Sequence, residues 1–256
     1  MNILITGAVG FAGKNLVAAL KNILQKKDRT HSELVIDEIY EYDIHTEATL
    51  LNTYCEKADF IFNFAGVNRP QNNDEFMAGN FGFAETLINL LKKHQNTCPV
   101  VLSSSIQATL IGRYANSDYG KSKLAGEELF FQYGEETGAK VLVYRFPNLF
   151  GKWCRPNYNS AVATFCNNIA NDLPVQVNDR NTELELLYID DLVEEMLAAL
   201  NGREHHCGFD GVRAIGQDNG KYCYAPTTHH VTLGEIVDLL NSFKNQPQTL
   251  VMPEIP

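Results

Sequence analysis

A tyrosine and a lysine lie four residues apart in the segment Tyr119-Gly-Lys-Ser-Lys123. The apolar spacing between Tyr119 and Tyr133 predicts a helix, and residues four apart share one face of a helix. A lysine ammonium favours the ionised form of a nearby phenol, so we expect Lys123 to lower the pKa of Tyr119 from about 10 towards neutrality. A tyrosine tuned in this way can exchange a proton with a carbonyl or a sugar hydroxyl. Because Tyr-x-x-x-Lys is common on surface helices, its significance depends on the rest of the chain.

A glycine-rich segment, Gly7-Ala-Val-Gly10-Phe-Ala-Gly13, joins the first predicted strand to the first predicted helix. Glycines allow a tight turn and a close approach to a pyrophosphate, while the helix N-terminus presents free N–H groups and partial positive charge. The spacing differs from Gly-x-Gly-x-x-Gly, but its place between strand and helix is the one that dinucleotide sites use. We therefore expect a dinucleotide to bind at Gly7, Gly10, Phe11, Ala12 and Gly13.

An acidic residue at the end of the second strand usually binds the ribose hydroxyls of such a dinucleotide. Asp43 is our candidate, and Asp37 is the alternative if the strand has another register. Asp43 lies later than the usual ~20 residues after the glycines, because the polar segment 26–33 lengthens the connection. No arginine is near Asp43, which favours NAD over NADP, although the neighbouring His45 leaves the preference open.

Three serines, Ser103 to Ser105, end the fourth predicted strand. Binding sites in open α/β sheets lie beyond the carboxyl ends of the strands, where the glycine segment and the tyrosine helix also begin. We therefore expect these features to form one site. In that site a serine hydroxyl would hydrogen-bond the same substrate oxygen that the tyrosine serves.

Segments typical of strands alternate with segments typical of helices up to Phe146. Short branched apolar runs indicate buried strands, and apolar residues three or four apart indicate helices. Their alternation predicts a doubly wound α/β domain with a parallel, Rossmann-type sheet. The predicted strands are 2–6, 34–43, 59–64, 99–103 and 140–145, and the predicted helices are 11–26, 46–57, 75–93 and 119–133.

The pattern changes after Phe146. The capping box Thr232-Leu-Gly-Glu235 predicts the start of a last helix, whereas residues 201–228 give no clear prediction. The other expected elements are an ordered loop at 147–160, a helix at 160–171, a strand at 183–188 and a helix at 189–200.

The length of 256 residues fits one compact domain or two closely joined ones. No segment is flexible enough in composition to separate independent domains. We expect a dinucleotide-binding domain over residues 1–150, to which residues 183–200 return. A smaller C-terminal subdomain over residues 151–256 would mainly bind substrate.

The composition excludes several classes of function. Apolar residues make up 45% and charged residues 20%, as in ordinary globular proteins, and the net charge of −10 opposes binding to nucleic acid or to an anionic membrane. No apolar run approaches the ~18–20 residues of a membrane span. The N-terminus lacks the basic and apolar regions of a signal peptide, so we expect a cytoplasmic protein.

The cysteines and histidines do not indicate a metal site. The six cysteines contain no Cys-x-x-Cys pair, and cytosolic thiols stay reduced. The clusters His205-His206-Cys207 and His229-His230 lack the spacing of a structural zinc site, and adjacent histidines in a strand point to opposite faces. We expect neither disulfides nor a bound metal.

Several motifs in combination resemble one protein family. They are Thr6-Gly-x-x-Gly10-Phe-x-Gly13, Asn63-Phe-Ala-Gly66, the serine cluster, Tyr119-x-x-x-Lys123, Arg145-Phe-Pro-Asn148-Leu-Phe-Gly151 and Tyr188-Ile-Asp-Asp191. Together they are similar to the extended short-chain dehydrogenases/reductases, the NAD-dependent epimerase/dehydratase family. The resemblance extends from residue 1 to about residue 245 and implies an NAD(P)-dependent enzyme acting on nucleotide sugars.

The resemblance implies a role for each matching residue. Tyr119 would protonate the carbonyl oxygen at carbon 4 of the sugar, and Lys123 would lower the pKa of Tyr119 and bind the nicotinamide ribose. Ser105, with Ser104 as the alternative, would orient the substrate oxygen. The remaining contacts would come from Ala65, Gly66 and Asn80 to the cofactor, and from Asn148, Asn157 and Arg180 to the nucleotide-sugar diphosphate.

A closer resemblance is carried by Ser103–Ala108, Pro147–Ser160 and Val177–Asn181. It is to the reductase domains of two-domain enzymes of capsular polysaccharide synthesis. It implies reduction of a 4-keto UDP-linked deoxy amino sugar with NADPH, a homodimer through helices 75–93 and 119–133, and a following cupin domain that we expect to be absent from this chain. Two alternatives stay open: a UDP-sugar 4-epimerase with bound NAD, and a non-catalytic dinucleotide-binding sensor, which would usually lose the Tyr–Lys pair.

The sequence departs from the family pattern in three places. Ile106 and Gln107 replace the Asp-Glu pair that sugar dehydratases place after the serine, so we do not expect dehydration. Leu184 stands where many relatives have an arginine, so phosphate contact must come from elsewhere, such as Arg180. The segment 43–45 also lacks the arginine expected for NADPH, so the residues favour NAD while the resemblance favours NADP.

Overall fold

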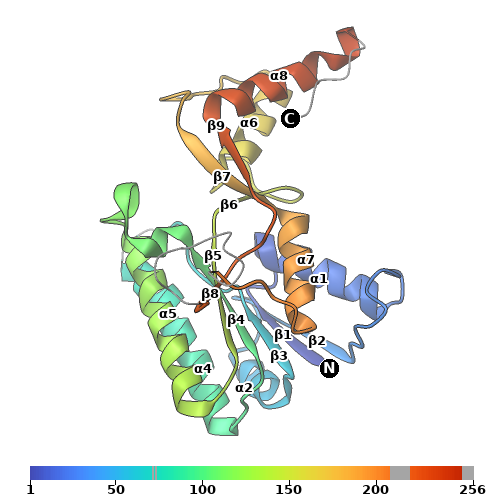
Figure 1. Ribbon diagram of the computed structural model, residues 1–256, viewed down its shortest axis with the longest axis vertical. Coiled ribbons are helices and arrows are strands. Elements are labelled where there is room, and N and C mark those ends of the chain that lie inside the picture. Colours follow the sequence, from blue (N-terminus) through green and yellow to red (C-terminus); the bar gives the residue numbers. More distant parts are fainter. Residues whose placement is uncertain (71, 73, 208–219, 250–256) are drawn as a thin grey trace. The chain divides into compact units, whose positions relative to one another are not determined.

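The computed structural model describes residues 1–70, 72, 74–207 and 220–249 (Figure 1). The chain divides into two compact units. The larger unit comprises Met1–Phe146 and Leu192–Pro226, and the smaller unit comprises Pro147–Asp191 and Thr227–Pro256. The predicted subdomain tail at 250–256 and part of the unassigned region 201–228 lie outside the described residues.

A six-stranded parallel sheet forms the centre of the larger unit in its described part. The strands are buried apolar runs, as expected for a sheet that is covered on both faces. The strand order is β2-β1-β3-β4-β5-β8, which confirms the doubly wound α/β fold. The strands are β1 (Asn2–Thr6), β2 (Glu38–Tyr42), β3 (Phe60–Asn63), β4 (Val100–Ser105), β5 (Val141–Phe146) and β8 (Tyr222–Cys223).

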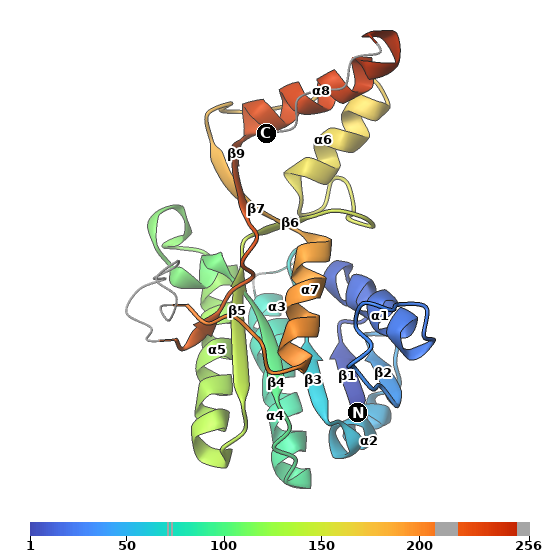
Figure 2. The same cartoon turned by 45° about the vertical axis from the view of Figure 1, so that its right-hand side comes forward.

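Helices cover both faces of this sheet (Figures 1 and 2). Helices α2 (Ala48–Lys57), α4 (Phe83–His94) and α5 (Asp118–Thr137) pack their apolar stripes against one face, in a core that includes Leu51, Leu87 and Phe130. Helix α1 (Phe11–Leu24) and residues 192–200 of α7 (Ile189–Leu200) lie over the other face. Two short 3-10 helices, η2 (Ile106–Thr109) and η3 (Gly112–Tyr114), connect β4 to α5.

The helix predicted over residues 75–93 is interrupted. It consists of α3 (Asp74–Phe76), a π-helical turn η1 (Met77–Gly82) and α4. The side chain of Asn80, inside the π-helical turn, bonds the backbone of Val67 in both directions, with its Oδ1 accepting at 2.9 Å and its Nδ2 donating at 3.2 Å. These bonds fix the turn against the segment that follows β3, which a regular apolar pattern does not reveal.

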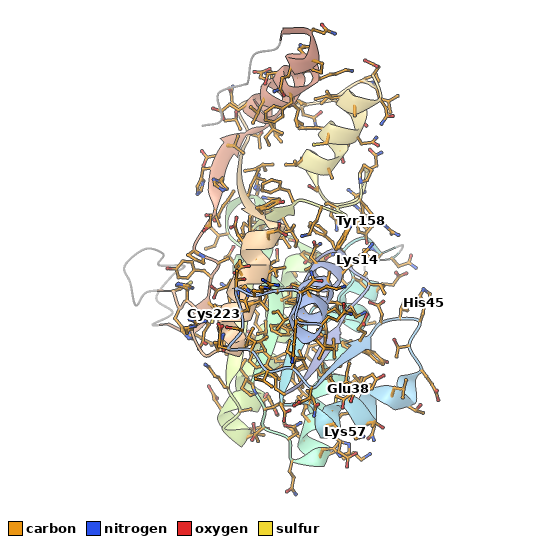
Figure 3. All side chains as sticks on the ribbon, turned by 90° about the vertical axis from the view of Figure 1, so that its right-hand side faces the viewer. Lys14, Glu38, His45, Lys57, Tyr158 and Cys223 are labelled. Carbon is orange, nitrogen blue, oxygen red and sulfur yellow. The ribbon has the colours of Figure 1, made fainter. Side chains whose placement is uncertain are left out.

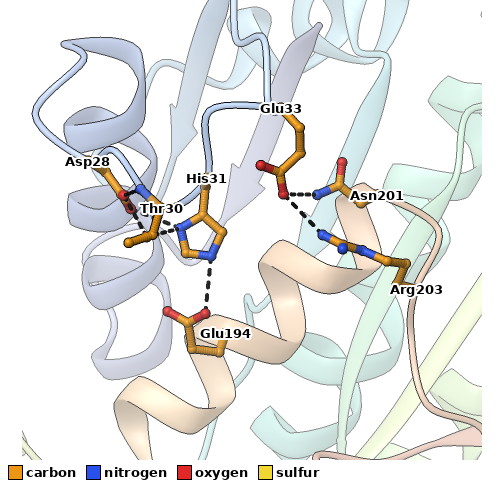
Figure 4. A network of polar contacts seen from close by, with 7 residues as sticks. All are labelled: Asp28, Thr30, His31, Glu33, Glu194, Asn201 and Arg203. Carbon is orange, nitrogen blue, oxygen red and sulfur yellow. Dashed lines mark hydrogen bonds and ion pairs between the residues drawn. The ribbon is translucent and has the colours of Figure 1, made fainter.

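The polar segment after α1 is fixed on helix α7 (Figure 4). The ring of His31 lies between Asp28, at 2.9 Å from Nδ1, and Glu194, at 3.1 Å from Nε2. The carboxylate of Glu33 accepts a hydrogen bond from Arg203 at 3.0 Å. The longer connection to β2 is therefore held by ion pairs at the protein surface.

The smaller unit contains a three-stranded sheet in its described part, in the order β6-β7-β9. Strand β7 (Glu183–Tyr188) belongs to this sheet, whereas we expected residues 183–200 to return to the first domain. The reason is pairing, because β7 bonds β6 (Asn148–Phe150) in parallel and β9 (His229–Thr232) antiparallel. The return begins at Leu192 and continues to Pro226, so residues 201–226, which we expected in the C-terminal subdomain, also belong to the larger unit.

Two helices pack on the small sheet, α6 (Ala161–Ala170) and α8 (Leu233–Thr249). Their core includes Phe165, Leu186 and Ile236. The predicted capping box is confirmed, since Glu235 Oε2 accepts from the Thr232 N–H at 2.7 Å and the Glu235 N–H donates to Thr232 Oγ1 at 3.2 Å. Among the described helices none has both the length and the apolar character to cross a membrane.

Candidate active site

The glycine-rich segment forms a tight turn between β1 and α1. Gly7 has a φ of +69°, and a Cβ at this position would lie 2.7 Å from the backbone of Ala65. A Cβ at Gly13 would lie 2.2 Å from the Gly7 oxygen, so this first helical turn packs directly on the loop. Gly10 precedes helix α1, and no side chain caps the first N–H groups of that helix. The loop therefore leaves backbone donors that an anion can accept.

Asp43 lies directly after β2 and holds this loop. Its Oδ2 accepts a hydrogen bond from the Val9 N–H at 2.8 Å, and its Oδ1 accepts one from the Ile44 N–H at 2.8 Å. A carboxylate has about four acceptor positions, so two of them remain for other donors such as ribose hydroxyls. Figure 3 shows Lys14 on α1 and His45 on the loop that follows Asp43.

The ends of β1 and β3 are joined beneath the glycine loop. The buried Thr6 hydroxyl donates to Asn63 Oδ1 at 2.6 Å and accepts from the Ala65 N–H at 3.3 Å. Ala65 and Gly66, which we expect to contact a cofactor, thus lie next to the glycine-rich loop. A Cβ at Gly66 would lie 2.7 Å from Asn80 Oδ1 and 3.0 Å from Lys123 Nζ, so only glycine fits between these groups.

Asn80 is buried and has structural partners on both sides. Besides its two bonds to Val67, its Nδ2 donates to Ser122 Oγ at 2.9 Å, and Ser122 in turn donates to the Tyr119 carbonyl at 2.8 Å. Asn80 therefore ties the segment after β3 to the first turn of α5. This arrangement positions Gly66 and Lys123 relative to each other.

Tyr119, Lys123 and Ser105 come together where β4 ends and α5 begins. The ammonium of Lys123 donates to the Ser103 carbonyl at 3.0 Å and lies 5.8 Å from the centre of the Tyr119 ring. The Ser105 hydroxyl hydrogen-bonds the phenol and also accepts from the Gln107 N–H at 3.2 Å. Ser117 caps α5 by accepting from the Gly120 N–H at 2.9 Å, which fixes the turn that carries Tyr119.

Burial governs the protonation of this pair. It raises the pKa of Tyr119 to about 12, against a lowering by the Ser105 hydrogen bond. It lowers the pKa of Lys123 to about 8, although the charge of Glu127 raises it. Our expectation that Lys123 brings the pKa of Tyr119 towards neutrality is therefore wrong for the chain by itself, because desolvation of the phenolate dominates. At neutral pH the phenol is protonated and can act as an acid.

Ser104 does not share the environment of Ser105. It is buried, and its hydroxyl donates to Glu127, so the alternative assignment of Ser104 to the substrate oxygen does not fit its geometry. The reason is the alternation of side chains along β4, which turns neighbouring serines to opposite faces. Ser105 alone of the two lies against the phenol of Tyr119.

The glycine loop fits a dinucleotide. Its helix N-terminus lacks a capping side chain and lacks acidic residues in its first turn, so anionic phosphates meet no repulsion there. Asp43 stands at the strand end where a ribose hydroxyl would need an acceptor. Among the described residues, no cluster of three or more His, Cys, Asp or Glu could hold a metal ion, and all six cysteines are free thiols.

The sequence and this site match one family. A profile of the NAD dependent epimerase/dehydratase family covers residues 3–207. The chain belongs to this family. The expectation drawn from the combined motifs is thereby confirmed.

The curated relatives of this chain include both a reductase and epimerases of UDP-linked sugars. The chain is 34% identical over 255 residues to a UDP-2-acetamido-2,6-beta-L-arabino-hexul-4-ose reductase of Pseudomonas aeruginosa, covering 100% of this chain and 61% of that protein. It is 25% identical over 282 residues to UDP-glucuronate 4-epimerase 6 of Arabidopsis thaliana, covering 94% of this chain and 60% of that protein.

Solved structures show the same fold. The capsular polysaccharide assembling protein CapF from Staphylococcus aureus matches with a TM-score of 0.77 at 44% identity, covering 99% of this chain and 61% of that one. A UDP-glucuronic acid 4-epimerase from Bacillus cereus in complex with NAD matches with a TM-score of 0.72 at 18% identity, covering 96% and 85%, a likeness of fold alone. The chain spans less than two thirds of the length of the Pseudomonas reductase and of CapF.

The smaller unit carries the three residues expected to face the sugar diphosphate. Asn148, on β6, donates to the Glu185 carbonyl at 3.1 Å. Asn157 has a positive φ of 55°, and its N–H donates to Thr164 Oγ1 at 2.9 Å. The Arg180 guanidinium contacts both carboxylate oxygens of Asp238 at 2.7 Å, and both side chains are more than half exposed. Each of the three therefore has a partner within this unit.

Sequence reasoning missed the buried acid beneath the site. Glu127 follows Lys123 by one helical turn, is fully buried and pairs with Arg145 at 2.5 Å. Tyr222, from the unassigned region, donates to the same carboxylate at 3.0 Å. The spacing Tyr119, Lys123, Glu127 would have placed all three on one helix face, and this signal was present in the sequence.

Proposed function

We propose that the chain catalyses the NAD(P)H-dependent reduction of a 4-keto group on a UDP-linked deoxy amino sugar, as a step in making precursors of surface or capsular polysaccharide. The observation that supports this most directly is the contact of the Tyr119 phenol with Ser105, with the Lys123 ammonium 5.8 Å from the centre of the Tyr119 ring. A reductase needs an acid at the carbonyl oxygen. The similarity to the Pseudomonas reductase makes a 4-keto sugar the leading substrate class, and the similarity to CapF supports a role in capsular polysaccharide assembly.

In this proposal Ser105 and Tyr119 both hydrogen-bond the carbonyl oxygen of the substrate. A reduced nicotinamide cofactor, held by the glycine-rich loop, Asp43 and Lys123, would supply the hydride that the carbonyl carbon accepts. The carbonyl oxygen takes the proton from the phenol, so a hydroxyl forms and Tyr119 is left as phenolate. The Ser105 hydroxyl and the Lys123 ammonium stabilise that phenolate, which burial alone would disfavour.

The same geometry argues against dehydration. Gln107 Oε1 accepts a hydrogen bond from Ser117 Oγ at 2.8 Å, so this side chain supports the start of α5. Neither Ile106 nor Gln107 carries a carboxylate that could remove a ring proton or protonate a leaving hydroxyl. Reduction and epimerisation need neither step, and they remain the two candidate reactions.

A UDP-sugar 4-epimerase is the second candidate, because the same Ser105, Tyr119 and Lys123 would serve it. An epimerase regenerates its cofactor and retains NAD, whereas a reductase releases oxidised cofactor. Tightly bound NAD in the purified protein would favour the epimerase. A non-catalytic sensor predicts that Tyr119→Phe leaves every output unchanged.

The decisive experiment follows nicotinamide absorbance with a UDP-linked 4-keto-6-deoxy amino sugar, offering NADH and NADPH separately. Oxidation of either cofactor supports the reductase. Tyr119→Phe should lower turnover by about 10²–10⁴-fold with little loss of cofactor affinity. Turnover retained in this variant contradicts the acid role of Tyr119. Absence of oxidation in a protein that still binds NADH contradicts the reductase.

For the cofactor we propose NADH, on the basis of Asp43. A 2′-phosphate at the adenosine ribose would meet a carboxylate already engaged with the Val9 and Ile44 N–H groups. Asp43→Ser should therefore weaken the preference for NADH, so that the affinities for NADH and NADPH become more similar.

Gly10→Val tests the glycine-rich loop. A Cβ at Gly10 would lie 3.1 Å from the Gly7 oxygen, so the valine side chain would occupy the space through which the pyrophosphate approaches the backbone. This variant should block binding of both cofactors.

For the substrate we propose that Asn148, Asn157 and Arg180 face the UDP diphosphate. Arginine suits phosphate oxygens, and the exposed pair of Arg180 with Asp238 leaves the guanidinium reachable. Arg180→Gln should raise KM for the UDP-sugar without changing cofactor affinity. We further propose that the protein is cytoplasmic. We also propose that it forms a homodimer that pairs through α4 and α5, and sedimentation analysis tests its oligomeric state.

A further inference from the structure

Glu127 is a buried carboxylate on the face of α5 that carries the candidate catalytic groups. Tyr119, Lys123 and Glu127 follow one another at intervals of four residues, so they form one row along the helix. Glu127 has no exposed surface, and Lys123 is 7% exposed. A buried charge needs partners, because its transfer from water is costly.

Three strands provide the partners of this carboxylate. Arg145 on β5 donates from Nε to Oε1 at 2.9 Å and from a terminal nitrogen to Oε2 at 2.5 Å. Ser104 on β4 donates to Oε1, and Tyr222 on β8 donates to Oε2 at 3.0 Å. Arg145 also stacks on the Tyr222 ring, 4.0 Å from its centre. The carboxylate thus links α5 to the ends of three neighbouring strands.

The network reaches Lys123 by two routes. Through the chain, Ser104 lies between Ser103, whose carbonyl accepts from Lys123 at 3.0 Å, and Ser105, which bonds the phenol of Tyr119. Through space, the negative charge of Glu127 favours the ammonium form of Lys123, against a burial that disfavours it. Fixing Ser104 therefore fixes both of its neighbours.

We propose that Glu127 is a positioning residue for the active site, holding the end of β4 and keeping Lys123 in its ammonium form at neutral pH. The proposal rests on the proposed function in so far as Lys123 is taken to bind the cofactor ribose and stabilise phenolate. Glu127 itself takes part in no step of the proposed reduction.

Among the described residues, Glu127 is the charged group that acts on the pKa of Lys123. On α5 Lys123 faces Tyr119 and Glu127, while Arg145 on β5 and Tyr222 on β8 lie behind Glu127. Of these, Glu127 and Arg145 are the charged groups at neutral pH. A positive charge acts on an ammonium with the opposite sign to a negative one, so we expect removal of Arg145 and removal of Glu127 to shift the pKa of Lys123 in opposite directions.

The test measures how NADH binding and turnover decline at alkaline pH, which we call the alkaline limb of the pH dependence. Glu127→Gln removes the negative charge, so the pKa of Lys123 should fall and the limb should move to lower pH by about one unit. Glu127→Asp keeps the charge and should leave the limb near its wild-type position. Tyr222→Phe is the matched control, because it removes one bond to the carboxylate without changing any charge and should not move the limb.

Arg145→Gln is the second variant, in case Glu127→Gln does not fold. It leaves Glu127 with the Ser104 and Tyr222 donors and removes the opposing positive charge. The limb should then move to higher pH. Loss of structure alone moves the limb in no particular direction, so opposite shifts in the two variants distinguish positioning from a merely structural role.

A folded Glu127→Gln protein with an unmoved limb overturns the proposal, as does an Arg145→Gln limb that moves to lower pH or stays in place. NADH binding separates this failure from failure of the proposed function, because it does not depend on which sugar is reduced. If no sugar is turned over but the binding limb shifts as stated, the positioning role stands and the reductase assignment fails.

Discussion

Two polar networks of the larger unit use similar residues in different surroundings. Beneath the candidate active site, Glu127 and Arg145 are 0% and 9% exposed. At the surface, Glu33 and Arg203 are 45% and 64% exposed and bridge the segment after α1 to the end of α7 (Figure 4). Both networks contain a carboxylate and an arginine at 3.0 Å or less.

The difference shows what burial changes. Water and salt screen the surface pair, and such pairs contribute little to stability. The buried pair has lost its water, so removing either partner leaves an uncompensated charge. The charge of Glu127 therefore acts on the neighbouring Lys123 with little screening by water. The surface network instead fixes a chain segment.

The largest effect should come from breaking the buried pair. Glu127→Gln is expected to lower the free energy of unfolding by about 3–5 kcal/mol, because Arg145 is left buried without a counter-charge. Urea unfolding of the whole chain measures this. A loss no larger than that of the surface variant Arg203→Gln would contradict the greater contribution of the buried pair.

An intermediate effect is expected for Tyr222→Phe. The phenol donates to a charged acceptor, and a hydrogen bond to a charged group contributes about 1.5–3 kcal/mol. The same urea experiment measures this loss of unfolding free energy. Tyr114→Phe is the control, because it removes the hydroxyl of a partly buried tyrosine on η3 that lies outside the network. A loss as large as that of Glu127→Gln would mean that the hydroxyl, rather than the ion pair, holds the network.

A small effect is expected for Arg203→Gln. Removal of this exposed partner of Glu33 should cost about 0–1 kcal/mol at low salt. The difference from wild type should shrink further at high salt, where surface charges are screened. A salt-independent loss above this range would contradict the assignment of the surface network as screened.

The smallest effect, and the one that depends on pH, concerns His31. Burial lowers its pKa, but the hydrogen bond to Asp28 and the charge of Glu194 raise it more, and the net direction is upward from 6.5. Because the folded form binds the proton more tightly, its stabilisation is present below pH 6.5 and is lost as the pH rises through the raised pKa. His31→Gln should therefore lower Tm more at pH 5.5 than at pH 8.5. Equal shifts at both values would contradict this.

Much of the larger unit could be predicted because its elements depend on local patterns. The buried strands, the glycine turn and the helix spacing are all visible in a single sequence, and the structure reproduces them within a few residues. The capping box of Thr232 and Glu235 is likewise a local pattern. The π-helical turn around Asn80 is not, because it depends on bonds to Val67 on another segment.

The sequence predicts those parts of the site whose chemistry follows from residue type. It does not predict the properties that depend on burial, such as the pKa of a side chain. Tyr119, Lys123 and Ser105 were found from spacing and motif. The pKa of Tyr119 was predicted in the wrong direction, because desolvation depends on packing that the spacing does not show. Glu127 was overlooked, since a glutamate on a helix is usually exposed. Its partner Tyr222 lay in a region without a recognisable pattern.

Strand β8 has a consequence for the order in which the chain can fold during synthesis. It supplies Tyr222 and pairs with β5 through Val143 and Tyr144. A nascent chain that has not reached residue 223 therefore leaves β5 as an open edge and Glu127 without one of its donors. The ribosome must release nearly the whole larger unit before the acid beneath Lys123 is complete. Until then, the first strands and helices of this sheet form an intermediate with an exposed edge, which is the form most prone to pair with another chain.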